Sequence, residues 1–231
     1  MTLSSLKSDL QRFTDPIRAK HSLRSFKTGK GEYGERDKFL GLTLPQIHVI
    51  AKKYKDLSLA DLQKLLHSPY HEHRLTALLI LVRQFKKNKS YKVYKIYMNN
   101  TRWINNWDLV DLSAPHIVGG YLLNKPRKVL YKLAKSKLLW DRRIAVLATL
   151  MFIRNDDFKD CLQIAKILLG DKEDLIHKAV GWMLREVGKK EVKVLEKFLE
   201  KNISQMPRTC LRYAIEKLPE GKRKYYLHKK D

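Results

Sequence analysis

The chain has 231 residues and a formal net charge of +24, from 48 Lys and Arg against 24 Asp and Glu. A hydrophobic content of 44% is typical of a globular protein and excludes a largely disordered chain. The excess of positive charge indicates a polyanionic partner, with nucleic acid first and an anionic membrane surface second. No apolar run reaches the roughly 18 residues of a transmembrane helix, so no membrane span is predicted, and we expect DNA and not a membrane as the partner.

The N-terminal residues carry no basic segment followed by an apolar one, so no secretory signal peptide is predicted. The only cysteines, Cys161 and Cys210, lack the spacing of a metal or redox motif. We interpret them as reduced core thiols. These features predict a cytoplasmic protein, associated with the nucleoid when it binds DNA.

Apolar residues recur at helical spacing along nearly the whole chain, and strand-like alternation is rare. We expect one domain over residues 1–231, with a long loop at 27–42 and a basic C-terminal end at 221–231. The predicted helices are 3–13, 16–26, 45–54, 58–67, 71–86, 89–99, 105–118, 127–135, 140–153, 158–169, 173–187, 191–201, 207–217 and 221–228.

An internal repeat is visible in four similar segments, each with a basic residue at the same point: Arg74, Arg143, Lys178 and Arg212. The period is about 35 residues, and the missing register point falls at Leu109. Two helices per period predict an all-α, right-handed superhelical solenoid of helical hairpins with one concave face.

Trp107 and Asp111 lie four residues apart in a predicted helix, which places both side chains on one face. Pro115 cannot donate to the carbonyl of Asp111, so the helix must bend there or leave that carbonyl free. An ordinary helix start, with an acid near the positive end of the dipole, is the alternative interpretation. We expect Asp108 to be the structural cap.

The repeat register favours a functional role for Asp111. Two residues after the basic position, the other repeats carry small uncharged residues, and only this repeat carries a carboxylate: Thr76, Asp111, Ala145, Val180 and Ala214. A charge in place of a packing residue usually marks a functional or strained site.

The predicted helix at 173–187 has an apolar stripe and, on the opposite side, a second stripe containing Trp182. The cations of that second stripe are Lys178, Arg185 and Lys189. Trp182 is therefore a candidate aromatic platform within a phosphate-binding surface. The alternative is that it packs on a neighbouring repeat or on the stems of the basic side chains.

Arg143 begins a helix that is apolar nearly all round, and Arg154 shares a stripe with it. A buried arginine paired with an acid and a phosphate clamp are both possible interpretations, since the guanidinium has a fixed fork of donors.

Two other patterns are weak. The Gly29–Gly34 segment matches GxGxxG but follows no strand, so a dinucleotide site is not expected. His71 and His73 lie on different faces of a helix, which makes joint metal ligation improbable. We predict neither a metal nor a cofactor.

Four segments resemble the AlkD-type DNA alkylation repair glycosylases, a family built of HEAT-like repeats, and the resemblance covers nearly the whole chain. They are the Asn-Asn-Trp-Asp-Leu-Val-Asp-x-Ser-Ala-Pro segment at 105–115, Trp-Asp-Arg-Arg at 140–143, Lys-Ala-Val-Gly-Trp-Met-Leu-Arg-Glu at 178–186 and Phe-Leu-Gly-x-x-x-Pro at 39–45. The Gly-x-Tyr-Gly-Glu-x-Asp run at 31–37 departs from the pattern of some members.

The resemblance implies that Trp107 and Trp182 flank the deoxyribose of a lesion, with Asp111 as catalytic carboxylate and Arg143 as its companion at the backbone. Arg185 and Lys189 match positions that hold phosphates. Lys178, Arg142 and Arg154 complete the expected DNA-binding set. Members of the family are described as leaving the base stacked.

We therefore expect a monomeric, monofunctional DNA glycosylase that hydrolyses the N-glycosidic bond of cationic N3- or N7-alkylated purines in duplex DNA, on a HEAT-like solenoid with a basic concave face. Two alternatives remain open: a non-catalytic DNA- or RNA-binding solenoid, and a protein-binding scaffold whose charge serves solubility.

Overall fold

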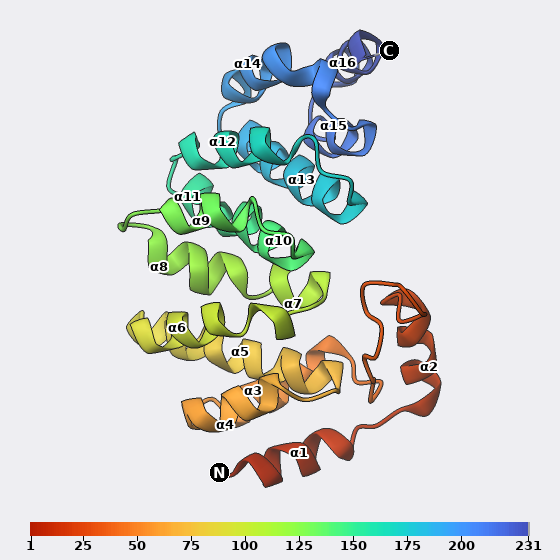
Figure 1. Cartoon of the computed structure of the whole chain (residues 1–231), viewed down its shortest axis with the longest axis vertical. Coiled ribbons are helices and arrows are strands. Elements are labelled where there is room, and N and C mark those ends of the chain that lie inside the picture. The colour runs from red at the N-terminus through yellow and green to blue at the C-terminus, as the bar shows by residue number, and fades with distance from the viewer. Residues whose placement is uncertain (231) are drawn as a thin grey trace. The chain divides into compact units, whose positions relative to one another are not determined.

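The computed structural model describes residues 1–230, which form helices joined by turns and one long loop (Figure 1). Within these residues there is no strand, only an isolated parallel bridge between Lys38 and Tyr70. The predicted all-α helical-repeat fold is thus confirmed. The contacts divide the chain into two compact units, Met1–Ile117 and Val118 onward.

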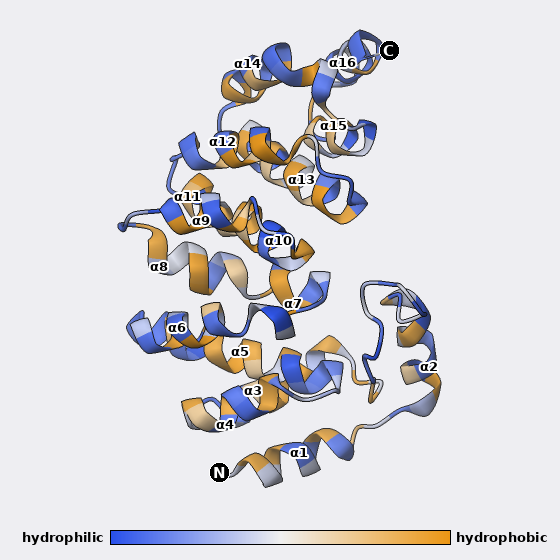
Figure 2. Ribbon diagram, in the orientation of Figure 1, coloured by the Kyte–Doolittle hydropathy of each residue, from blue (hydrophilic) through white to orange (hydrophobic). Residues whose placement is uncertain are grey.

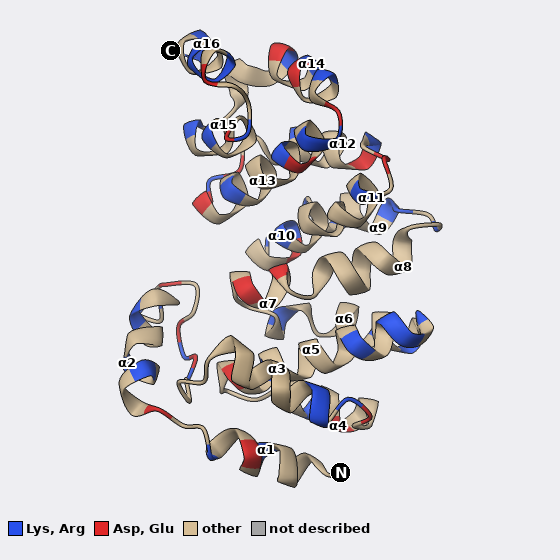
Figure 3. Cartoon of the chain, turned by 180° about the vertical axis from the view of Figure 1, so that it is seen from behind, with Lys and Arg blue, Asp and Glu red and all other residues tan. Residues whose placement is uncertain are grey.

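The first unit holds the longest loop of the chain and seven α-helices. They are α1 (Leu3–Gln11), α2 (Pro16–Ser25), α3 (Leu44–Lys53), α4 (Leu59–Leu66), α5 (His71–Asn88), α6 (Tyr91–Asn99) and α7 (Trp107–Asp111), with a 3-10 turn at Thr101–Trp103. Helix α5 is buried along most of its length and packs against α3 and α4. Helix α2 has no buried residue and lies to one side of α3 and α5 (Figures 1 and 3).

The second unit repeats short helical hairpins. Its helices are α8 (Gly120–Leu122), α9 (Lys128–Leu133), α10 (Leu139–Ala148), α11 (Leu150–Arg154), α12 (Lys159–Leu168), α13 (Asp174–Lys190), α14 (Val192–Asn202), α15 (Arg208–Ala214) and α16 (Glu220–Lys230), with a 3-10 turn at Ile203–Gln205. Helix α13 packs against α10, α12, α14 and α15. Apolar and polar faces alternate around single helices such as α13 (Figure 2).

The repeat register predicted from the sequence agrees with the positions of the helices. Helices α5, α7, α10, α13 and α15 begin at intervals of about 35 residues and carry the five register points. The small residues of the register, Thr76, Ala145, Val180 and Ala214, are all buried, whereas Asp111 is only half-buried. The carboxylate therefore replaces a core residue at a position that reaches solvent.

The segment 105–118 was expected to be one helix and is not. Helix α7 ends at Asp111, and a π-helical turn follows at Pro115–Gly119. Pro115 has no N–H for the carbonyl of Asp111, so the hydrogen-bond ladder cannot run through this point. The chain resumes with wider π-type spacing, a device common at functional sites.

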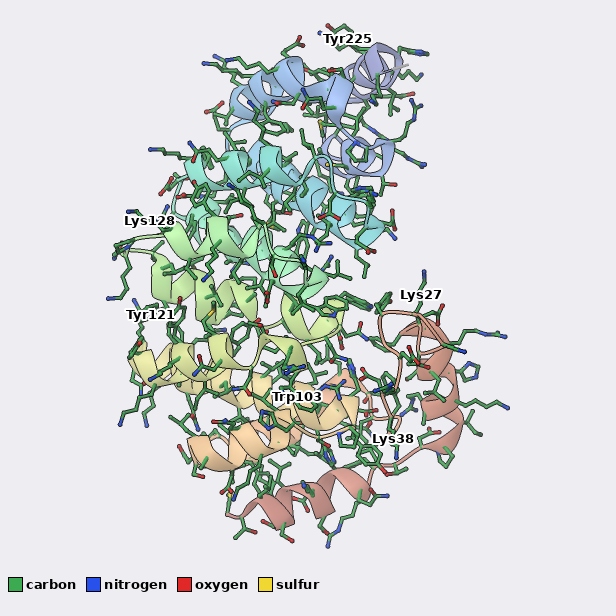
Figure 4. The ribbon with its side chains drawn as sticks, in the orientation of Figure 1. Lys27, Lys38, Trp103, Tyr121, Lys128 and Tyr225 are labelled. Atoms are coloured by element: carbon green, nitrogen blue, oxygen red, sulfur yellow. The ribbon has the colours of Figure 1, made fainter. Side chains whose placement is uncertain are left out.

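The segment between α2 and α3 includes the predicted loop at 27–42 and closes on the start of α2. The Asp15 N–H donates to the Leu40 carbonyl at 2.9 Å, and Arg18 donates to the Gly41 carbonyl at 3.0 Å. Gly41 has a φ of +88°, and a Cβ there would lie 2.1 Å from the Asp15 carbonyl, so this closure needs glycine. Lys27 lies at the outer end of the loop (Figure 4).

Candidate active site and DNA-binding residues

Helix α7 has five residues and is held by side-chain hydrogen bonds rather than by its own length. Its N-cap is the fully buried Asn106, whose side chain accepts the Trp107 N–H at 2.9 Å. The expectation that Asp108 is the cap was therefore wrong. Asp108 lies in the first turn, where it accepts the Leu109 N–H and bonds His71, each at 2.8 Å.

Trp107 and Asp111 line one cavity of about 300 Å³ in the first unit. The indole of Trp107 is 38% exposed and stacks on Phe26, with ring centroids 5.6 Å apart and planes 10° apart. Asp111 takes part in further polar interactions and is half-buried. The predicted pair thus lies together at a solvent-accessible edge, on one face of α7.

The walls of this cavity are mainly apolar and come from α2, α3, α5, α7 and the long loop. Besides Trp107 and Asp111, the lining residues are Ser22, Phe26, Phe39, Leu42, Leu44, Ile47, His71, Glu72, Leu75, Asp108 and Leu112. Such a surface offers apolar and aromatic contact with few hydrogen-bond donors, and carboxylates stand at its edge.

Glu72, which lines the cavity, holds the end of the long loop in place. Its buried carboxylate accepts the backbone N–H groups of Leu40, Gly41 and Leu42 at 3.0, 2.7 and 3.4 Å. These three bonds satisfy donors that would otherwise be buried without partners. Glu72 therefore fixes Phe39 and its neighbours against α5.

His71 lies buried between two carboxylates, Asp108 at 2.8 Å and Asp37 at 3.6 Å. Burial alone would lower the pKa of its imidazole, but the charge and hydrogen bond of Asp108, together with Asp37, raise that pKa to about 9. Asp37 also pairs with the buried Arg74 at 2.6 Å. His71 is therefore a buried cation at neutral pH.

Sequence reasoning did not identify Phe26, Phe39 or His71 as parts of the site. Phe26 directly precedes the long loop and Phe39 lies near its end, and their rings stack on each other with centroids 5.1 Å apart. Nothing in helical periodicity reports a contact made by loop closure. The only sequence feature that could have indicated this contact is that a glycine-containing segment separates the two phenylalanines.

In the second unit, Arg143 lies buried on α10, and its guanidinium donates to the Leu175 carbonyl at the start of α13. It has further polar interactions. Trp140 is buried on the same helix. Trp103, in the first unit, is 36% exposed and stacks on His67 with ring centroids 4.9 Å apart (Figure 4).

Helix α13 buries the predicted apolar stripe and leaves Trp182 half-buried. The indole N–H of Trp182 donates to the Glu186 carboxylate at 3.1 Å. The same carboxylate pairs with Lys189 at 2.8 Å. Glu186 is thus an acidic partner that joins the ring and the lysine, and the sequence reasoning had not included it.

The expected cationic stripe of α13 is interleaved with acids, a correction to its description as a set of cations alone. Lys178 pairs with Asp174 at 2.6 Å, and Arg185 pairs with Glu216 on the turn after α15. Asp174 lies one turn away on the same helix, whereas Glu216 lies on a segment that sequence spacing does not relate to α13. Figure 3 shows the same mixture of signs on other helices.

The two remaining predicted DNA contacts differ in their surroundings. Arg142 binds both carboxylate oxygens of Asp171, at 2.6 and 3.3 Å, and donates to two backbone carbonyls. Arg154 ends α11 and is exposed. Arg142 therefore has a bidentate structural partner, whereas Arg154 is accessible to a polyanion.

Among residues 1–230 there is no cluster of three or more side chains suited to hold a metal ion. No helix in that range combines the length and the apolar character needed to cross a bilayer.

The helical-repeat fold, the high positive charge and the Trp107–Asp111 pair agree with the family suggested by the sequence. The model of the DNA alkylation repair enzyme family matches residues 6–218, which is most of the chain. The chain therefore belongs to the family of DNA alkylation repair enzymes.

A solved structure has the same fold. It is described as a predicted DNA alkylation repair enzyme from Enterococcus faecalis, and it matches with a TM-score of 0.72 at 16% sequence identity. The match covers 90% of this chain and 97% of the other. None of the curated proteins compared with the chain matches it.

Proposed function

We propose that the protein is a monofunctional DNA glycosylase that hydrolyses the N-glycosidic bond of cationic N3- or N7-alkylated purines in duplex DNA. It acts as a monomer and needs no cofactor. Asp111 is the catalytic carboxylate, and Trp107, Trp182 and Arg143 complete the catalytic set. Lys178, Arg185, Lys189, Arg142 and Arg154 bind the DNA.

The observation that carries this proposal is the half-buried carboxylate of Asp111 beside the exposed indole of Trp107, at the edge of an apolar cavity. The equivalent residue of the other repeats is buried and uncharged. A fold that needed only packing at this position would not place a charge there.

The chemistry suits these two groups. A purine alkylated at N3 or N7 is cationic, so its base can leave without a general acid. The sugar then develops positive charge, which a preorganised carboxylate stabilises, and the same carboxylate can orient the attacking water. An aromatic face beside the sugar attracts the same charge through cation–π interaction.

The basic residues of the second unit fit contacts to DNA phosphates. Arg143 carries a fork of donors suited to a phosphate, although it is buried and donates to the Leu175 carbonyl, so a phosphate would have to compete for it. Trp182 offers an aromatic surface joined to Lys189 through Glu186. The acidic partners of Lys178, Arg185 and Lys189 preorganise these side chains, and phosphates compete with those carboxylates for them.

The decisive experiment replaces Asp111 with Asn and measures single-turnover release of 7-methylguanine together with DNA binding. The change is nearly isosteric and removes one charge. We expect the rate to fall by roughly 100-fold or more, the scale for losing one electrostatic group, while affinity stays equal or improves. Asp61→Asn on the exposed start of α4 is the matched control.

An excision rate close to that of the parent in the Asp111→Asn protein would remove Asp111 from the mechanism. The non-catalytic DNA- or RNA-binding protein would then be the better account of the same charge distribution.

A further inference from the structure

The buried imidazole of His71 contacts three of the elements that surround the Trp107–Asp111 pair in the first unit. Its Nε2 lies 2.8 Å from Asp108 on α7, and its Nδ1 lies 3.6 Å from Asp37 on the long loop. Its ring stacks on Phe39 and meets Phe26 at a tilt of 42°, with each centroid 4.8 Å away. One side chain on α5 thus joins α7, the loop and the end of α2.

His71 acts on Trp107 indirectly, through Phe26. Phe26 ends α2 and has His71 on one side and Trp107 on another, the latter stacked at 5.6 Å. Helix α2 itself buries no residue. The position of Phe26, and with it the support of the indole, therefore depends on the ring stack around His71.

His71 acts on Asp111 indirectly, through the first turn of α7. That helix is too short to be stable alone, and its ladder stops before Pro115. Asp108 ties its first turn to His71 while accepting the Leu109 N–H. If Asp108 lost its hydrogen bond to His71, the short helix that also carries Asp111 would no longer be held in position.

The geometry favours the charged form of the ring, although Nδ1, at 3.6 Å from Asp37, forms no hydrogen bond. A neutral imidazole that donates from Nε2 to Asp108 would turn the lone pair of Nδ1 toward Asp37, which is unfavourable. A cation faces two carboxylates and two aromatic rings, and all four contacts are attractive. Arg74 on the same helix lowers the pKa of His71 and pairs with Asp37 at 2.6 Å, and the carboxylates of Glu72 and Asp111 line the same cavity as His71.

We propose that His71 is a positioning residue for base excision, whose imidazolium holds Asp108 and Phe26 in place and thereby fixes the carboxylate of Asp111 and the indole of Trp107. The inference rests on the proposed glycosylase function for its kinetic part. The coupling of His71 to Trp107 stands on geometry alone.

The kinetic test compares the pH dependence of single-turnover excision in three proteins, measured from preformed complexes: the parent, His71→Gln and Asp108→Asn. In the parent, the rate should fall as pH rises through about 9, where His71 loses its proton. His71→Gln should be slower at neutral pH by roughly tenfold or more, the scale for a misplaced catalytic group, and should lack the alkaline fall.

Asp108→Asn separates positioning from mere structural support. Asn keeps the acceptor for the Leu109 N–H but removes the charge that favours the imidazolium. The alkaline fall should therefore move to lower pH. A residue that only fills space would leave that pH unchanged. His48→Gln on α3, a partly exposed histidine outside the cavity lining, is the matched control and should keep the parental profile.

A second readout does not need the enzymatic reaction. In protein labelled with 5-fluorotryptophan, the fluorine signal of Trp107, identified by its loss in Trp107→Phe, should shift with pH at the midpoint of His71 titration. It should do so in the Asp111→Asn protein as well, and it should not do so in His71→Gln.

A Trp107 signal that does not follow pH, together with an alkaline profile unchanged in Asp108→Asn, overturns the inference. A titrating Trp107 signal in a protein that excises no base at any pH supports the coupling and counts against the glycosylase function instead. The two proposals can therefore fail separately, and unfolding of the His71→Gln protein leaves the Asp108→Asn comparison in place.

Discussion

His71 and His73 lie two residues apart on α5, and the protein holds the first as a cation and the second as a neutral ring. His71 faces Asp108 and Asp37, which raise its pKa to about 9. His73 bonds the Ser68 hydroxyl at 2.8 Å, and burial, with the charges of Lys7 and Arg74, lowers its pKa to about 4.

The opposite shifts predict opposite pH dependences of stability. The pKa of His71 is raised on folding, so its contribution is complete below about pH 6.5 and is lost as pH rises toward 9. The pKa of His73 is depressed, so folding loses free energy as pH falls from about 6.5 toward 4. Each contribution is about 3 kcal/mol at most, from the size of the shift.

Chemical denaturation between pH 4 and pH 9.5 measures this. His71→Gln should flatten the alkaline side of the stability curve and leave the acid side unchanged, and His73→Gln should do the reverse. Equal effects of the two substitutions on both sides would show that the two rings titrate alike.

Lys189→Ala should weaken binding to all duplexes alike and reduce the slope of log K against log salt by about 1, because one phosphate contact is lost. Glu186 pairs with Lys189 at 2.8 Å, so Glu186→Gln should strengthen binding. Titrations at several salt concentrations give the slope. Lys87→Ala at the exposed end of α5 is the control, and a slope equal to the parent's in Lys189→Ala would place that lysine outside the interface.

Trp182→Ala should reduce excision and leave most of the stability intact, because the indole is half-buried and lies away from the apolar stripe of α13. Trp140→Ala is the comparison, since Trp140 is buried and its truncation should cost about 3–5 kcal/mol. Thermal melts of both variants measure and compare the two losses of stability. An equal loss of stability in the two would show that Trp182 is a packing residue.

Gly181→Ala should destabilise the second unit, although alanine is the better helix former. A Cβ at Gly181 would lie 2.5 Å from both the Cys210 carbonyl and Tyr213 Cβ, where α13 packs closely against α15. Overpacking of this kind costs about 1–3 kcal/mol. Gly170→Ala, with nothing within 4 Å of the added carbon, should be neutral, and denaturation midpoints compare the two.

Much of the chain's organisation follows from local chemistry. Helical periodicity places Trp107 and Asp111 on one face, and the missing N–H of Pro115 ends their helix. The 35-residue register marks Asp111 as a charge in a packing position, and the burial of Val180 and Ala214 agrees with that register. These features depend on neighbours within one or two turns, which sequence spacing reports.

The ion pairs of α13 could be predicted from the sequence only in part. Asp174 and Glu186 lie within one turn of Lys178 and Lys189 on the same helix, where sequence spacing could have indicated them. Glu216 could not be predicted in this way, because it comes from the turn after α15. The N-cap of α7 was likewise assigned to Asp108, whose carboxylate instead hydrogen-bonds His71 on α5. In these last two cases only packing brings the partners within reach.

The sequence by itself determined the helical repeat, the break at Pro115 and the carboxylate–indole pair, since each arises from backbone geometry over a few residues. Only the tertiary structure decided that Phe26, Phe39 and His71 meet behind that pair, because loop closure joins segments more than thirty residues apart. It also decided the charge of His71. An imidazole's protonation depends on how deeply it is buried and which carboxylates surround it, and neither is a property of the residues next to it in the chain.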